Sequence, residues 1–231
     1  MKAVLFDLDG TLLDRETSIR SFIDDQYKRL SSFFPHVSKQ AFMIRFITFE
    51  CHGYVWKDQV YQQLVKEFSI SGVAWEQLFN DYQTSFHQHC TAFPHLTEML
   101  EELKKAGYFL GIVTNGKGDF QMATIRALNI ETFFHIIVIS EWAGVKKPDP
   151  TIFTKALCEL GVPAQESIFI GDHVENDIKA AHHVGMKTIW KRNDQWNDVA
   201  ADAVIDDLIE IKMTLQRFQK KINLERDERS I

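Results

Sequence analysis

The stretch AVLFDLDGT, residues 3–11, decides the fold. Residues 3–6 form a short apolar run of the kind that makes a strand buried on both faces of a sheet. Asp7 and Asp9 follow this run directly, and Gly10 completes an Asp-x-Asp-Gly sequence. Taken alone, such a sequence indicates only a turn, because Asp bonds its own backbone and Gly tolerates positive φ.

Apolar runs of the same kind recur along the second half of the chain. They lie at residues 108–113, 136–139, 167–170 and, more briefly, 187–190. Segments with helical spacing separate them, at residues 95–106, 119–128, 150–160 and 175–184. Strands that alternate with helices of this length indicate βαβ units. The sequence therefore predicts an α/β fold with a doubly wound parallel sheet.

Residues 15–92 break this rhythm and show helical periodicity throughout. Apolar residues recur at helical spacing in four stretches, which Pro35, Gly53 and Gly72 punctuate. We expect about four helices that form an all-helical cap domain, inserted as a lid over the carboxyl edge of the sheet. The core domain would then comprise residues 1–14 and 93–231.

Composition narrows the class of partner. The 231 residues are 45% hydrophobic and 25% charged, and the formal net charge is -6. An acidic chain argues against a nucleic acid polymer as partner, since such binding requires a basic face. Three scattered cysteines and no long apolar segment indicate no disulfide framework, signal peptide or membrane span. We expect a cytoplasmic protein, and a monomer by default.

Polar residues follow four of the predicted strands. Besides Asp7 and Asp9, they are Thr114 and Asn115 after the second strand, Lys146 and Lys147 after the third, and Asp172 and Asp177 after the fourth. Ligands of open α/β sheets bind beyond the carboxyl ends of the strands, so we expect these side chains to converge. Carboxylate clusters favour a hard cation such as Mg²⁺, which leaves room for a phosphate. The sequence predicts an active site for phosphoryl chemistry.

These four motifs, in this order and with a helical insertion between the first two, resemble the haloacid dehalogenase superfamily and its phosphatases with a helical cap. The resemblance spans nearly the whole chain and implies a Rossmann-like core. It implies that Asp7 is the nucleophile, forming an aspartyl-phosphate. Asp9 would protonate the leaving alcohol and then deprotonate water, and its backbone carbonyl would bind the metal.

The resemblance also implies roles for the remaining motif residues. Thr114 and the backbone amide of Asn115 would bind the phosphoryl group, and Lys147 would neutralise it. Asp7, Asp9 and Asp172 would hold Mg²⁺, while Asp177 would act in the first or second coordination shell or hold Lys147. Lys146 is adjacent to Lys147, so only one of the two can point into the site. His173 is expected to be a neighbour of the site and not a ligand.

Three other functions share parts of this pattern. A 2-haloacid dehalogenase attacks carbon and needs neither metal nor an acid at the second position, so Asp9 favours a phosphatase. A phosphotransferase such as a sugar phosphomutase uses the same nucleophile and remains open. A phospho-receiver domain would leave the helical insertion unexplained. The expected substrate is a small phosphorylated metabolite, such as a nucleotide, phosphoglycolate or a sugar phosphate.

The predicted cap also holds Cys51, His52, His87, His89 and Cys90. A structural zinc site would need these residues at ligand spacing. His87 and Cys90 could share a helical face, but His89 would point elsewhere. Ordinary packing within the helices is therefore the favoured interpretation.

Overall fold

The computed structural model describes residues 1–228, with side chains described as far as residue 220, so the last three residues of the expected core segment lie outside it. Within that range the sheet has six parallel strands in the order β3-β2-β1-β4-β5-β6. The strands are β1 (Ala3–Phe6), β2 (Phe109–Thr114), β3 (Ile136–Ile139), β4 (Ser167–Gly171), β5 (Lys187–Lys191) and β6 (Ala203–Ile205). The strand order reverses beside β1, which confirms the doubly wound parallel sheet.

Strand β1 lies at the centre of the sheet because all four of its residues are apolar and fully buried. It pairs with β2 on one side and β4 on the other, with Phe6 opposite Ile112 and Ile170. Successive side chains of a strand point to opposite faces of the sheet, so both faces of β1 need cover. The central position places Asp7 between the ends of β2 and β4.

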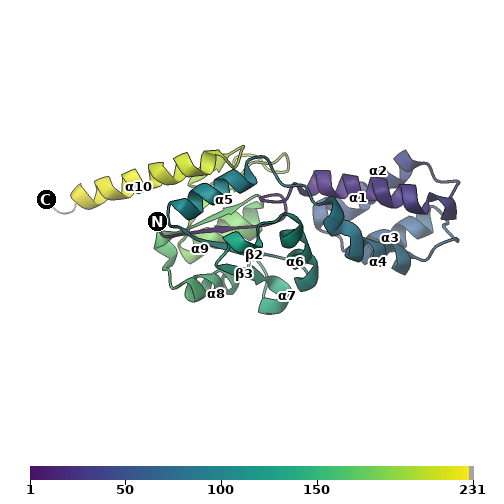
Figure 1. The fold of residues 1–231 in the computed structure, drawn as a ribbon, viewed down its shortest axis with the longest axis horizontal. Helices are drawn as coiled ribbons and strands as arrows, with labels where there is room; N and C mark the ends of the chain where they lie inside the picture. The colour runs from purple at the N-terminus through teal and green to yellow at the C-terminus, as the bar shows by residue number, and fades with distance from the viewer. Residues whose placement is uncertain (229–231) are drawn as a thin grey trace. The chain divides into compact units, whose positions relative to one another are not determined.

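Helices provide that cover on both faces of the sheet, as Figure 1 shows. Helices α5 (Leu96–Lys105) and α10 (Glu210–Glu228) pack against each other on one face. Helices α8 (Pro150–Leu160) and α9 (Ala180–Val184) pack together on the other face. The α8 side buries Leu5, Phe153 and Phe169 in a continuous apolar cluster. Helices α6 (Gly118–Ala127) and α7 (Ser140–Ala143) follow β2 and β3.

Two features of the core differ from the sequence prediction. Strand β6 was not predicted, because three residues are too few to show the hydrophobic pattern of a strand. Only one of its side chains, that of Ile205, is buried. The predicted helix at residues 175–184 is divided into a π-helix, Val174–Lys179, and the short α9. Side-chain periodicity does not distinguish one wider turn from an α-helical turn, so the π-helix could not be predicted from the sequence pattern.

The chain divides into two compact units, of which the core comprises Met1–Asp14 with the residues from Ala92 onward. The second unit, Arg15–Thr91, contains α1 (Arg15–Leu30), α2 (Lys39–Glu50), α3 (Lys57–Glu67) and α4 (Trp75–Ser85). Its interior includes Phe22, whose ring meets Tyr82 edge-on at 5.4 Å between centroids. The buried carboxylate of Glu50 binds both Arg15 (2.5 Å) and Lys57 (3.0 Å).

Among residues 1–228, no helix is long and apolar enough to cross a lipid bilayer.

The core interior can be tested with a pair of phenylalanines. Phe153 is fully buried against Phe169, whereas Phe109 is 42% exposed. We expect Phe153→Ala to lower the free energy of unfolding by about 3–5 kcal/mol, because truncation leaves a cavity. Phe109→Ala should cost about 1 kcal/mol or less. Urea unfolding followed by circular dichroism measures both, and equal losses would contradict the described packing.

Candidate active site

The carboxyl ends of β1, β2 and β4 meet at one edge of the sheet, where Asp7, Thr114 and Asp172 lie. The amide of Asp7 donates to the carbonyl oxygen of Ile170 at 2.9 Å. This bond continues the ladder between β1 and β4 by one residue. The backbone of Asp7 is therefore as fixed as the strand that precedes it.

Three carboxylates gather at this edge. Oxygens of Asp7, Asp172 and Asp177 all lie within 4.8 Å of one another. The side chains of Asp7 and Asp177 are buried, and that of Asp172 is partly buried. A set of oxygen ligands at such spacing fits a hard divalent cation, which would offset the repulsion among the carboxylates.

Lys147 is the ammonium group within this cluster. Its Nζ donates to Asp7 Oδ1 at 2.5 Å and to Asp177 Oδ1 at 2.6 Å, and the residue is 3% exposed. Burial by itself would lower the pKa of Lys147, but the carboxylates of Asp177 and Asp7 outweigh it and raise that pKa. The adjacent Lys146 is exposed. Of the two lysines, the structure therefore places Lys147 in the cluster.

The cluster also shifts the titration of its acids. Burial raises the pKa of Asp7 well above its ordinary value; Lys147 opposes this change, while Asp177 and Asp172 add to it. Burial and the negative charge of Asp177 raise the pKa of Asp172 to about 7. A bound cation would favour the ionised form of both acids.

Local backbone features bring Asp177 to this position. The ring nitrogen Nδ1 of His173 accepts bonds from the amides of Glu175 and Asn176, which caps the π-helix. Asp177 Oδ2 in turn accepts the amide of His173 at 3.0 Å. A Cβ on Gly171 would lie 2.5 Å from the side chain of Asp177, so only glycine permits this approach. A wider turn and one glycine thus return Asp177 to the end of β4.

Asn115 fixes the loop that carries Lys147. Its Nδ2 donates to the carbonyl oxygen of Lys147 at 3.0 Å, and its Oδ1 accepts the amide of Lys147 at 2.8 Å. The side chain of Asn115 is therefore engaged in holding Lys147. This contact was not anticipated from the sequence, which suggested only a backbone role for Asn115.

Asp9 and Thr114 lie beside each other but outside the three-carboxylate group. The Nε2 atom of Gln121 donates to Asp9 Oδ2 at 2.8 Å and lies 2.9 Å from Thr114 Oγ1. Close packing also fixes the Asp-x-Asp-Gly turn, since a Cβ on Gly10 would lie 2.3 Å from Asp172 Oδ2. The first motif therefore packs against the fourth, and Gln121 links it to the second.

Sequence reasoning missed two polar residues at this edge, Gln121 and Asn193. Asn193 donates through Nδ2 to Asp172 Oδ2 at 3.1 Å. No regular spacing marks Asn193 in the sequence. Gln121 did leave a signal, because it shares the apolar face of its helix with Ile125 and a buried polar residue needs a partner.

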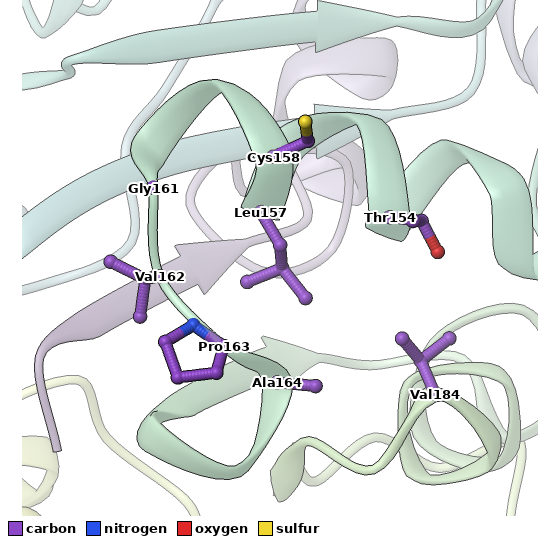
Figure 2. A pocket seen from close by; sticks show the side chains of 8 residues that line it. All are labelled: Thr154, Leu157, Cys158, Gly161, Val162, Pro163, Ala164 and Val184. Atoms are coloured by element: carbon purple, nitrogen blue, oxygen red, sulfur yellow. The ribbon is translucent and has the colours of Figure 1, made fainter.

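A second concave feature lies elsewhere on the core. Figure 2 shows an open apolar hollow lined by Leu157, Val162, Pro163, Ala164 and Val184. These residues belong to the ends of α8 and α9 and to the loop before β4, so they adjoin the amino ends of the strands. No carboxylate, lysine, arginine or histidine lines the hollow, and it is separate from the carboxylate cluster.

The acidic cluster lies beyond the carboxyl ends of the strands, where open α/β sheets bind their ligands, and comparison with known proteins identifies the family. Residues 4–191 match the model of the haloacid dehalogenase-like hydrolases. A glyceraldehyde 3-phosphate phosphatase of Pyrococcus furiosus is 30% identical over 94% of both chains.

Solved structures agree with this match. A HAD phosphatase from Thermococcus onnurineus has a TM-score of 0.67 and 29% identity, covering 93% of this chain and 98% of its own. A 2-haloacid dehalogenase from Pseudomonas syringae has a TM-score of 0.64 and 26% identity, covering 94% and 99%. The chain belongs to the haloacid dehalogenase-like hydrolase family. Within that family it is a hydrolase of phosphoric monoesters.

The shifted pKa of Asp172 makes stability depend on pH. A carboxyl group whose pKa is raised on folding stabilises the protein fully below the unfolded value and loses this contribution as pH rises through the folded value. Without a divalent cation, this loss should occur between about pH 4 and pH 7. Asp172→Asn removes the titration. We therefore expect the variant to unfold at higher urea than the wild type near neutral pH, with an advantage that shrinks toward about pH 4.

Urea midpoints in the presence of chelator, measured across this range, test the expectation. Asp194→Asn makes the same chemical change at an exposed position and serves as the matched control. An advantage of Asp172→Asn that is constant with pH would show that the carboxyl group does not titrate as described.

Proposed function

We propose that this chain is a Mg²⁺-dependent phosphatase that hydrolyses the phosphomonoester of a small soluble metabolite through an aspartyl-phosphate on Asp7. The observation that carries the proposal is the buried cluster of Asp7, Asp172 and Asp177 with Lys147 at 2.5 Å from Asp7. A buried carboxylate at the end of a central strand is held rigidly enough to act as a nucleophile. The neighbouring charges supply what an anionic nucleophile needs in order to meet an anionic substrate.

The donor set supports Mg²⁺ as the cation. Asp7 and Asp172 would bind it through carboxylate oxygens and Asp9 through its backbone carbonyl, with Asp177 close enough to join or support them. The Nδ1 atom of His173 already accepts two backbone bonds, so that nitrogen is engaged in capping. When bound, the ion would mask the charge of the phosphoryl group.

The reaction would proceed in two steps. In the first, a carboxylate oxygen of Asp7 forms a bond to phosphorus while the bond from phosphorus to the leaving oxygen breaks, and Asp9 gives its proton to that oxygen. In the second, Asp9 takes a proton from water as the water oxygen attacks phosphorus. Inorganic phosphate then leaves, and the carboxylate of Asp7 is regenerated.

Three other residues would act on the phosphoryl group. Lys147 would neutralise its oxygens while remaining held by Asp177. Thr114 would donate its hydroxyl hydrogen to a phosphoryl oxygen, and the backbone amide of Asn115 would assist.

The presence of Asp9 distinguishes the proposed phosphatase from a dehalogenase. In dehalogenation, attack at carbon generates no leaving group that needs a proton, so an acid at the position of Asp9 is not required.

The substrate class follows from the proposed domain organisation and from the relatives. We propose that residues 15–92 form a cap domain that selects the substrate, inserted in a core of residues 1–14 and 93–231. Nucleotides, phosphoglycolate and sugar phosphates are candidates. The Pyrococcus relative is named for glyceraldehyde 3-phosphate, which supports a small phosphorylated metabolite as the substrate.

Every proposed site residue lies on one chain, so a monomer would suffice.

Asp7→Asn tests the nucleophile. We expect the wild-type chain to release phosphate from 4-nitrophenyl phosphate with Mg²⁺ and to lose this activity in excess chelator. The variant should fall to the background rate, because an amide cannot form the aspartyl-phosphate. Circular dichroism of the variant checks that the fold is retained. Undiminished activity in the variant or in chelator would remove the mechanism, and nitrophenol released without equivalent phosphate would indicate transfer instead of hydrolysis.

The two adjacent lysines provide a matched pair. Lys147→Met removes the buried ammonium, whereas Lys146→Met makes the same change at an exposed position. We expect kcat/KM to fall by about 100-fold or more for Lys147→Met, as for removal of other groups that stabilise transition-state charge. Lys146→Met should stay within about threefold of wild type. The reverse ranking would assign the cationic role to the wrong lysine.

A further inference from the structure

Gln121 is a buried side chain that the proposed chemistry does not use. It lies in the first turn of α6 and is 2% exposed. Its Nε2 atom lies 2.8 Å from Asp9 Oδ2, 2.9 Å from Thr114 Oγ1 and 3.1 Å from the carbonyl oxygen of Asn115. One side-chain nitrogen therefore contacts both Asp9 and Thr114.

The orientation of the Gln121 amide follows from its partners. The carboxylate of Asp9 and the carbonyl of Asn115 have no hydrogen to give, so both require a donor. The NH₂ group must face them, because the opposite orientation would place the amide oxygen against two acceptors. With two hydrogens, Nε2 can bond Asp9 with one and share the other between Thr114 and the carbonyl of Asn115.

These bonds determine what Asp9 and Thr114 can do. A hydroxyl that accepts a bond keeps its own hydrogen for another acceptor, so Gln121 leaves the Thr114 hydroxyl as a donor. In this structure the acceptor of that hydrogen is the carbonyl oxygen of Asn115, at a long 3.5 Å. A carboxyl held through Oδ2 keeps its other oxygen, Oδ1, to carry the proton. Gln121 thus favours the donor form of Thr114 and fixes one oxygen of Asp9.

The surrounding backbone holds Gln121 firmly. Its amide donates to the carbonyl oxygen of Lys117 at 2.9 Å, and a Cβ on Gly116 would lie 2.8 Å from Cγ of Gln121. Glu141 accepts the amide of Gly118 at 2.7 Å, which ties the start of α6 to α7. Few alternative rotamers are open to a side chain confined in this way.

We propose that Gln121 is a positioning residue that holds the Asp9 carboxyl group ready for proton transfer to the leaving oxygen. This inference rests on the proposed function, in which Asp9 is the general acid. It assigns a function to a residue outside the four motifs, and it makes α6 part of the proton-transfer machinery.

The test exploits the dependence of general acid catalysis on the leaving group. Phenolate is a poorer leaving group than 4-nitrophenolate and needs the proton of Asp9 more. Gln121→Met keeps the length of the side chain but removes the donor. We expect kcat/KM for phenyl phosphate to fall about tenfold, with a loss of about threefold or less for 4-nitrophenyl phosphate. Asp9→Asn should show the same selectivity with larger losses.

Thr124→Val is the control, because it removes a buried hydroxyl one turn along α6 that bonds only the helix carbonyl of Phe120. It should leave the ratio between the two substrates unchanged. Gln121→Asn keeps the amide but shortens the side chain by one methylene, so its NH₂ group no longer reaches Asp9. This variant should show the same selective loss, and it replaces Gln121→Met in the test if the Met variant does not fold.

Three outcomes separate the hypotheses. A selective loss for the poorer leaving group in the Gln121 variants supports the positioning role. Equal losses on both substrates, or no loss, would overturn it, because damage to phosphate binding or to the fold does not depend on the leaving group. Absence of selectivity in Asp9→Asn would instead reject Asp9 as the general acid, and with it the corresponding part of the proposed function.

Discussion

The rest of this edge of the sheet depends on one interaction. The ammonium group of Lys147 is buried between the carboxylates of Asp7 and Asp177 and forms an ion pair with each. An isolated charge in such a position would cost several kcal/mol of desolvation, and one carboxylate repays this cost only in good geometry. Two carboxylates at 2.5 and 2.6 Å provide that geometry. They leave the cluster with an excess of negative charge, which is the condition under which a divalent cation binds.

Much of the surrounding structure serves to hold this interaction in place. The side chain of Asn115 forms two hydrogen bonds with the backbone of Lys147. The π-helix and the close approach that Gly171 allows place Asp177 beside the end of β4. The face of the Phe169 ring lies 5.4 Å from Lys147 Nζ and adds a favourable contact for the cation. Asn115 lies in the loop after β2, whereas Gly171 and Phe169 belong to β4 itself. The rigidity of these contacts follows from the strands and not from the loops themselves.

The sequence predicted the parts of this arrangement that depend on strand order and local pattern. Asp7 follows a buried apolar run, and a central parallel strand places it between its neighbours whatever the side chains beyond do. Asp172 was found in the same way, whereas the choice of Lys147 over Lys146 came from the resemblance to the family. Gln121, Asn193 and the π-helix were not predicted. One wider turn does not change the side-chain periodicity, so the π-helix left no pattern. Gln121 and Asn193 act through contacts with Asp9 and Asp172, which lie 112 and 21 residues away. Such contacts leave no periodicity, and a single polar residue on an apolar helical face indicates a partner without naming it.

The same edge also contains a second buried lysine that bears on its charge balance. Lys191 ends β5, is 5% exposed, and places its ammonium 3.3 Å from the centre of the Phe93 ring. Burial lowers its pKa, against the opposing effect of Asp172 and other acids. Four motif carboxylates and one motif lysine would by themselves repel a phosphate dianion. A positive charge on Lys191 would reduce that repulsion, so in the proposed function Lys191 would share the binding of the anion with Lys147.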